Sequence, residues 1–300
     1  TDKGWGQTAL GTVSASGTVT ATQWASLVNT ISSMGSQTGT TITSRTAPVV
    51  GDTISILSAL NTDLTNITTN RGNAASSGTA ISAFTGTTAK TTATGSGQAS
   101  WTITFTHTIT FPSANQARYF WNAGGLVKIM YGKSSTGTDH DADWNTLAGQ
   151  CGALYISGRV AGAAQTIAGQ SYTGTTRIGG SGGTQTTLAT TTGWYSLTPG
   201  AAATTLFQLN SATAPYTPEY IQTTAAVNAG STTLTLVTTW YDDGSSGAGV
   251  SSNISGGTDT PSPATSITGT APTTLVNLIP PSTTYLTNSW GTPTIAASVA

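Results

Sequence analysis

The stretch "WTITFTHTITF", residues 101–111, alternates large side chains with threonine without interruption. Successive side chains of an extended strand point to opposite faces, so this pattern predicts a strand with one apolar face and one threonine face. The apolar face begins at Trp101 and includes Phe105, and Pro112 ends the pattern. We therefore expect a β-rich protein in which this strand contributes one face to the core.

His107 lies on the apolar face of the same strand. One interpretation is a buried catalytic base. The other is a histidine in the core or at an interface, held by a backbone hydrogen bond, and this is the one we favour.

Two stretches upstream have the spacing of amphipathic helices. In the first, residues 20–35, Thr20 or Thr22 is a candidate cap and Gly35 a candidate end. Its apolar stripe contains Trp24, Leu27, Val28, Ile31 and Met34. In the second, residues 51–72, the candidate caps are Asp52 and Thr53 and the stripe contains Ile56, Leu57, Leu60, Leu64 and Ile67. We expect the two helices to form a hairpin.

Downstream, "ARYFWNAGG" at residues 117–125 places three aromatic residues behind an arginine and before two glycines. An aromatic platform for a sugar or a cation is one interpretation. Adjacent side chains point in different directions, however, which favours a corner whose rings enter the core from two sides. Gly124 and Gly125 would then let the backbone reverse into a strand at 126–132, with Arg118 paired to an acid or a carbonyl.

Residues 139–155 predict a further helix with an acidic start. Its first residues offer candidate ligands for a divalent cation: Asp139, His140, Asp141 and Asp143. An acidic helix cap explains the same residues, and the glycine and distal glutamate of a calcium-binding loop are absent, so we favour the cap. We expect no metal and no cofactor.

Short strands separated by Gly, Ser and Asn follow, and residues from 280 onward predict an extended, irregular tail. We divide the chain into an N-terminal segment with two short helices (1–72), a β-rich core with the aromatic corner (73–160) and a β-rich C-terminal region with a tail (161–300). The expected fold is mainly β with a few short helices: an antiparallel, sandwich-like core with an N-terminal helical hairpin.

Only 6% of the 300 residues are charged, against roughly 25% in ordinary soluble domains, and the formal net charge is −1. Without a basic patch, nucleic acid is not an expected partner. No apolar run approaches the ~20 residues that span a bilayer, so we expect no membrane insertion. Such a composition suits a surface that lies against other protein or faces an extracellular medium.

Catalytic groups are scarce. No G-x-S-x-G motif surrounds a serine, and Cys151 lies on an apolar helix stripe, which favours an inert buried thiol. A depolymerase would need paired carboxylates, yet Glu219 is the single glutamate and no partner can be assigned to it. We expect a protein that is not an enzyme.

The stretch "ARYFWNAGG" resembles the Arg-Tyr-Phe-Phe-Asn-(Ser/Ala)-Gly-Gly motif of virion structural proteins from tailed bacteriophages, cyanophages among them. Trp121 stands where that motif has its second phenylalanine. Three further segments fit the resemblance, which covers about residues 4–155: "GWGQT" at 4–8, "TATQWASLVNTI" at 20–31 and "FPSAN" at 111–115, with Trp144 and Leu147 downstream.

The resemblance implies a structural, non-enzymatic virion component, which assembles as a homo-oligomer in the tail, neck or fibres of the extracellular particle. Its partners would be copies of itself and other virion proteins, with the host surface as a further partner. The residues expected to hold the fold and the assembly are Arg118, Tyr119, Phe120, Trp121, Asn122, Gly124, Gly125, Trp24, Trp101, Phe105 and His107. Alternatives are a head decoration protein and a receptor- or glycan-binding adhesin, whose sugars would stack on Trp5, Trp194, Trp240 and Trp290.

Overall fold

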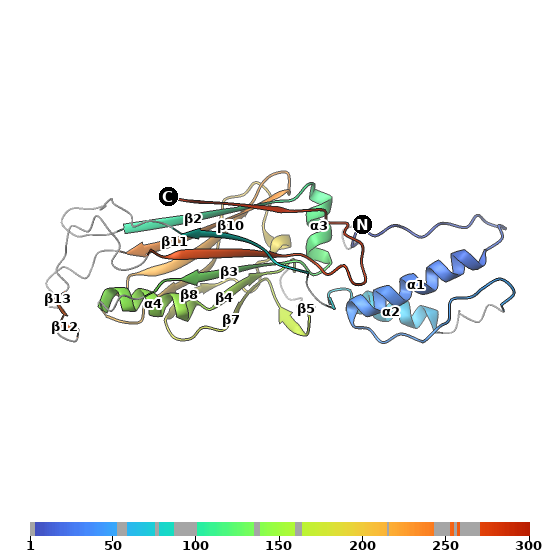
Figure 1. Ribbon diagram of the computed structural model, residues 1–300, viewed down its shortest axis with the longest axis horizontal. Helices are drawn as coiled ribbons and strands as arrows, with labels where there is room; N and C mark the ends of the chain where they lie inside the picture. Colours follow the sequence, from blue (N-terminus) through green and yellow to red (C-terminus); the bar gives the residue numbers. More distant parts are fainter. Residues whose placement is uncertain are drawn as a thin grey trace.

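The molecule is elongated, with a β-sandwich body and a helical hairpin that projects from one end (Figure 1). The structure is a computed structural model. The residues that the structure describes are 4–52, 59–75, 78–86, 101–134, 139–159, 164–214, 216–242, 253–254, 257–258 and 271–300.

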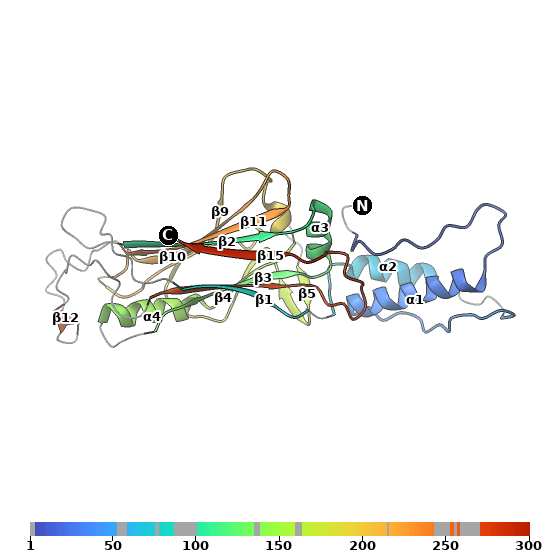
Figure 2. The ribbon, with the colours of Figure 1, turned by 45° about the horizontal axis from the view of Figure 1, so that its top comes forward.

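Two antiparallel sheets form the body and lie as two layers in Figure 2. The strand order in the larger sheet is β15 (Thr294–Val299), β2 (Trp101–Thr110), β11 (Thr233–Asp242), β10 (Tyr220–Val227), β9 (Thr204–Asn210) and β8 (Thr184–Leu188). The order in the other is β1 (Ile81–Gly86), β14 (Thr273–Ile279), β3 (Leu126–Gly132), β4 (Ala153–Ile156) and β7 (Thr175–Ile178). Two small ribbons pair β5 (Gln165–Ile167) with β6 (Gln170–Tyr172) and β12 (Asn253–Ile254) with β13 (Gly257–Thr258).

The alternating stretch forms β2, as its sequence predicts. Phe105, His107 and Ile109 are fully buried, whereas the threonines between them are half-buried or exposed. The side chain of Trp101 lies outside the described residues. The fold class predicted from the sequence, mainly β with short helices and a sandwich-like core, is confirmed.

Hydrogen bonds as well as apolar contacts join the layers. The Tyr131 hydroxyl lies 2.8 Å from Thr223 Oγ1, and Trp240 Nε1 donates to Thr274 Oγ1 at 3.2 Å. Each bond connects a residue of one sheet to a residue of the other. These bonds give polar groups in the interior a partner, which limits the cost of burying them.

The first predicted helix is α1 (Ala21–Thr38), and Thr20 caps it as expected: its hydroxyl accepts the Gln23 N–H at 3.3 Å, and Gln23 Oε1 in turn accepts the Thr20 N–H at 2.8 Å. The predicted end at Gly35 is wrong, because the helix continues to Gly39, which has φ +62°. Gly35 is instead a close-packed position, where an added Cβ would lie 3.1 Å from Ile42.

The second helix, α2 (Leu60–Asn70), is shorter than the 51–72 stretch predicted. Ala59 precedes it with φ +54°, and no side chain caps it, so the predicted caps Asp52 and Thr53 are wrong. Asp52 instead accepts a hydrogen bond from the Val49 N–H at 2.8 Å. Ile67 is buried and Leu64 is 40% exposed, while Ile56 and Leu57 lie outside the described residues.

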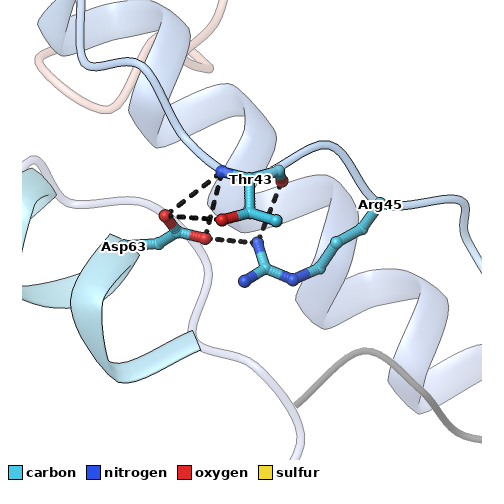
Figure 3. Close-up of polar contacts among 3 residues, drawn as sticks. All are labelled: Thr43, Arg45 and Asp63. Carbon is cyan, nitrogen blue, oxygen red and sulfur yellow. Dashed lines mark hydrogen bonds and ion pairs between the residues drawn. The ribbon is translucent and has the colours of Figure 1, made fainter. Parts of the chain in front are cut away.

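A polar contact ties the chain after α1 to α2 (Figure 3). The Asp63 carboxylate accepts the Thr43 N–H at 3.1 Å and lies 2.5 Å from Arg45 Nη1. Desolvation raises the pKa of Asp63, but the hydrogen bonds from Arg45 and Thr43 outweigh it, so the pKa lies below its ordinary value. The hairpin therefore contains a charged pair in a protein that has few.

The remaining helices are α3 (Ala114–Asn122), α4 (Asp139–Cys151) and the short 3-10 helix η1 (Trp194–Ser196). Figure 1 shows α3 at the end of the body next to the hairpin and α4 toward the opposite end. None of the helices in the described part of the chain is long and apolar enough to cross a membrane.

Both sheets combine strands from regions 73–160 and 161–300. β14 lies between β1 and β3, and β2 lies between β15 and β11. The tail predicted to be irregular from residue 280 onward contains β15, and Trp290 within it is only 2% exposed. The expectation of an irregular arm is therefore wrong for its last residues, which pair with β2 in register.

Candidate assembly site at the aromatic corner

The predicted corner is built on α3. Ser113 caps the helix, since its hydroxyl accepts the Gln116 N–H at 3.2 Å. Phe120 and Trp121 are fully buried, whereas Arg118 and Tyr119 lie half-buried on the other side, with the Arg118 guanidinium 5.3 Å from the centre of the Tyr119 ring. The rings therefore point in different directions and do not form one platform.

Two glycines complete the corner for separate reasons. Gly124 has φ +103°, a conformation that other residues rarely adopt. Gly125 lies against a ring, because a Cβ there would be 2.4 Å from Phe120 Cε1. The chain then enters β3 at Leu126.

The buried rings pack with two aromatic residues from elsewhere in the chain. Trp121 stacks on Trp194 with 5.4 Å between ring centres, and Phe120 lies 5.2 Å from Phe111. Aromatic pairs at these separations add about 0.5–1.5 kcal/mol each beyond the area they bury. The corner is therefore a main part of the core.

Three distant segments bond the carbonyl groups at the end of α3. Gln165 Nε2 donates to Trp121 O at 3.2 Å, Trp5 Nε1 to Asn122 O at 3.1 Å, and Gln37 Nε2 to Ala123 O at 3.3 Å. The last carbonyls of a helix have no partner within it, so these side chains take the place of the missing turn. The corner thus holds the N-terminal segment, α1 and β5 together.

Asn122 adds a second bond to the N-terminal segment and links one more segment, at Tyr195, to the corner. Its Nδ2 donates to Gly4 O at 3.0 Å, and its Oδ1 accepts from the Tyr195 hydroxyl at 2.7 Å. Gly6 lies so close to Tyr119 that an added Cβ would be 2.3 Å from the ring. The sequence identifies the aromatic residues here, but nothing in it singles out Gln37, Gln165 or Tyr195.

The other predicted residues lie elsewhere. His107 is buried between the sheets, where desolvation lowers its pKa to about 4, partly offset by a hydrogen bond to the backbone of Thr274. Phe105 precedes Phe111 by six strand residues, about 20 Å. Trp24 is 13 residues before Gln37 on α1, also about 20 Å. The structure therefore does not bring these residues to the corner.

The candidate metal ligands belong to the start of α4. Asp143 is buried and accepts a hydrogen bond from Ser211 Oγ at 3.0 Å. The side chains of Asp139, His140 and Asp141 lie outside the described residues, and no group of three potential ligands occurs among the side chains that are described. Burial raises the pKa of the Cys151 thiol, which keeps it protonated and unreactive.

The tryptophans considered as sugar-stacking surfaces are mostly inside the protein. Trp194, Trp240 and Trp290 are at most 6% exposed. Trp5 is half-buried, and its indole N–H bonds the corner. The expectation that these four rings offer stacking surfaces is wrong for the three buried ones.

Exposed apolar side chains gather instead on the hairpin and the segment that leads to it. Val50 is 93% exposed and Val49 67%. In the same parts of the chain, 39–40% of the side chain is exposed at Leu10, Val13, Val19 and Leu64, and on the body Ile81, Tyr195, Tyr285 and Val299 reach 37–41%. A cavity of about 540 Å³ lies at the base of this projection, lined by residues 4–10, Met34, Ile67 and Tyr119 among others.

Comparison of the chain with protein-family models, curated proteins and solved structures gave no match.

Proposed function

We propose that this protein is a non-enzymatic structural component of a tailed phage virion, assembling with copies of itself in the tail, neck or fibres. The observation that carries the proposal is the exposed apolar surface of the projecting hairpin. Exposed apolar surface of this kind marks contact sites in proteins. A second copy of the chain is the occupant that we assign to it.

The low charge of the chain supports the same proposal. With a formal net charge of −1 spread over 300 residues, little repulsion opposes the approach of a second copy. The cores of protein interfaces are likewise depleted in charge. The resemblance of residues 117–125 to a phage virion motif is the reason that we propose a virion as the particle in which the copies assemble.

Changing the hairpin surface tests the oligomer. In a variant with Val49→Asp and Val50→Asp, two carboxylates would have to be desolvated in the interface, so we expect the oligomer to dissociate. Light scattering coupled to size-exclusion chromatography measures the mass. Val299→Asp, which adds one carboxylate at a body position that is 37% exposed, is the control and should leave the mass unchanged.

A chain that is monomeric at high micromolar concentration, before any substitution, contradicts self-assembly. The virion setting has its own test, in which an antibody against the chain labels purified particles. Labelling of tail, neck or fibres supports the proposal, abundant labelling of the head supports a decoration protein instead, and particles without the chain contradict both.

A further inference from the structure

The end of the hairpin that lies farthest from the body is apolar. After α1 the chain runs back along the hairpin to this end, where a turn over residues 49–52 reverses it (Figure 1). We call residues 49–52 the tip. Val50 is 93% exposed and Val49 67%, more than any other large apolar side chain that the structure describes. Two such exposed side chains indicate a surface that another molecule covers.

At the other end of the hairpin, next to the body, the cavity of about 540 Å³ forms a groove that we call the basal groove. The apolar residues of its lining are Trp5, Leu10, Met34, Ile67 and Tyr119. The groove is open to solvent, because Leu10 is 40% exposed. Its volume lies within the range of about 300–1,000 Å³ that holds a drug-sized ligand, so the groove has room for two valine side chains.

The tip of a chain lies too far from the basal groove of the same chain to enter it. The 18 residues of α1 span about 27 Å from the far end of the hairpin to the corner, where Gln37 bonds Ala123 O. The tip also lies beyond the start of α2, since Thr43 bonds Asp63 and Val49 follows six residues later. The tip and the groove can therefore meet only between two copies.

The charges at the two ends of the hairpin are complementary. Arg71 is the one charged residue among the groove residues that the structure describes, and its Nη1 donates to Thr68 O at 3.1 Å. Asp52 is the charged residue of the tip, is exposed, and accepts the Val49 N–H at 2.8 Å. An exposed ion pair adds little affinity, but it orients two surfaces as they approach. The valines therefore supply the affinity of the contact.

We propose that the tip of each copy inserts into the basal groove of a second copy, so that the two hairpins lie side by side in opposite directions. This inference rests on the proposed function, in which a second copy covers the exposed apolar surface, and it names the surface that the tip contacts. A reciprocal pair fills both tips and both grooves, so the contact closes at two chains about a two-fold axis. Removal of Val49 and Val50 from water drives the association.

Cross-linking between two single-cysteine variants tests which surfaces meet. One variant carries Val50→Cys in the tip and the other Leu10→Cys in the groove, and we expect mild oxidation of the mixture to link the two chains by a disulfide. In the control, Val13→Cys replaces Leu10→Cys, because Val13 lies in the same segment, is 39% exposed and is outside the lining. It should give little product. Cys151 is buried and does not compete.

A chain that carries both Val50→Cys and Leu10→Cys tests whether the pair is reciprocal. We expect a covalent dimer and no larger species on a non-reducing gel, because the second tip returns to the first groove. A ladder of higher multiples would show that tip and groove join the copies head to tail, which would overturn the reciprocal pair.

Leu10→Asp tests what the groove contributes. It should raise the dissociation constant of the pair about ten- to a hundredfold, because a carboxylate in the groove must lose its water when the tip enters. Val13→Asp is the matched control, with equal exposure outside the lining, and it should leave the dissociation constant unchanged. Analytical ultracentrifugation measures both constants.

The results separate this inference from the proposed function. If Leu10→Asp associates as tightly as Val13→Asp and no disulfide links Val50→Cys to Leu10→Cys, the inference is overturned. If the variant with Val49→Asp and Val50→Asp nevertheless dissociates, the proposed self-assembly stands and the tip contacts a different surface of the second copy. An unmodified chain that is monomeric at high micromolar concentration overturns both.

Discussion

The corner is packed so closely at Gly125 that it has no room for a side chain. A methyl group there would lie 2.4 Å from Phe120 Cε1, and Phe120 is fully buried. We expect Gly125→Ala to lower the free energy of unfolding by about 1–3 kcal/mol, the usual cost of overpacking a core. Denaturant unfolding measures this loss.

Gly149→Ala is the control for that change. Gly149 lies within α4 and has no atom within 4 Å of its added Cβ, so alanine should stabilise by about 0.5–1 kcal/mol through helix propensity. Equal effects of the two substitutions would argue against close packing at Gly125.

His107 makes stability depend on pH. The folded histidine has a pKa of about 4 against an ordinary value of 6.5, so the unfolded chain binds the proton more readily. Protonation therefore favours unfolding, and the stability present above pH 6.5 is lost progressively as the pH falls toward 4. The expected loss is on the order of 1–3 kcal/mol.

His107→Leu should remove this part of the pH dependence, measured as the difference in unfolding free energy between pH 7 and pH 5. His140→Asn, at the chain's other histidine, should retain it. If the unfolding free energy of His107→Leu changed with pH as much as that of the unmodified protein, other groups would produce the pH dependence.

For single residues, the sequence predicts which side chains are buried better than it predicts which side chains form hydrogen bonds. The alternation at 101–111 places Phe105 and His107 inside correctly, because strand geometry fixes which side chains share a face. It gives no sign that Gln37 and Gln165 bond the end of α3, since glutamines occur commonly on surfaces and their partners lie 86 and 44 residues away.

Among the elements, the hairpin depends most on one polar residue. Asp63 joins α2 to Thr43 and Arg45, and its pKa is lowered by those bonds. Asp63→Asn keeps the shape but removes the charge, so we expect faster hydrogen exchange in residues 21–38 and 60–70. Hydrogen exchange in the strands of the body should be unchanged.

Asp52→Asn is the matched control, since Asp52 accepts a hydrogen bond from the Val49 N–H in an exposed turn. As the pH falls through the lowered pKa of Asp63, below its ordinary value of 3.8, Asp63→Asn and the unmodified protein should converge, because acid then protonates Asp63 itself. Equal exchange in both variants at pH 7 would contradict a stabilising role for the pair.

Trp5 tests the capping of α3. Trp5→Phe retains an aromatic ring but loses the N–H that bonds Asn122 O, and we expect it to cost about 1 kcal/mol in unfolding free energy. Trp24→Phe, on α1 away from the corner, is the comparison. A smaller loss at Trp5 than at Trp24 would count against this capping role.

The existence of elements was more predictable than their ends. The predicted strand at 126–132 is confirmed as β3, because it carries clear apolar periodicity. The helix predicted over 139–155 is present as α4 but ends at Cys151, and its predicted last residues, 153–155, lie in β4 instead. The end of α1 is an example: Gly35 has the residue type of a helix stop, but the helix continues past it, and its backbone packs closely against Ile42.

In the whole molecule, β15 covers an edge of the larger sheet. It pairs with β2 from Thr294 to Val299, although most of its side chains are exposed. Removing residues 292–300 would leave the long, regular β2 unpaired on one side, and such edges pair with other chains. We expect the truncated protein to aggregate through pairing of exposed β2 edges, which thioflavin fluorescence and light scattering would measure.

Ile295→Ala serves as its control, because it trims the half-buried side chain of β15 and keeps the backbone pairing. It should remain in solution. If the chain without residues 292–300 were as free of aggregates as Ile295→Ala, β15 would not be needed to protect the edge of the sheet.

Sheet order is what the sequence could not supply. β2 and β11 are neighbours in the larger sheet, and the sequence patterns of the two strands do not reveal that they pair. β14 enters between β1 and β3 from more than 140 residues beyond β3, and long-range pairing of this kind leaves no local signal.

The contact of Gln7 with Thr287 bears on how the protein is made. Gln7 Nε2 donates to Thr287 O at 3.0 Å across 280 residues, next to the Trp5 bond to the corner. During synthesis, the early segment must wait for nearly all later residues to leave the ribosome before it finds this partner. Such distant closures slow folding, so the nascent chain exposes unfinished surface for longer and would benefit from chaperones.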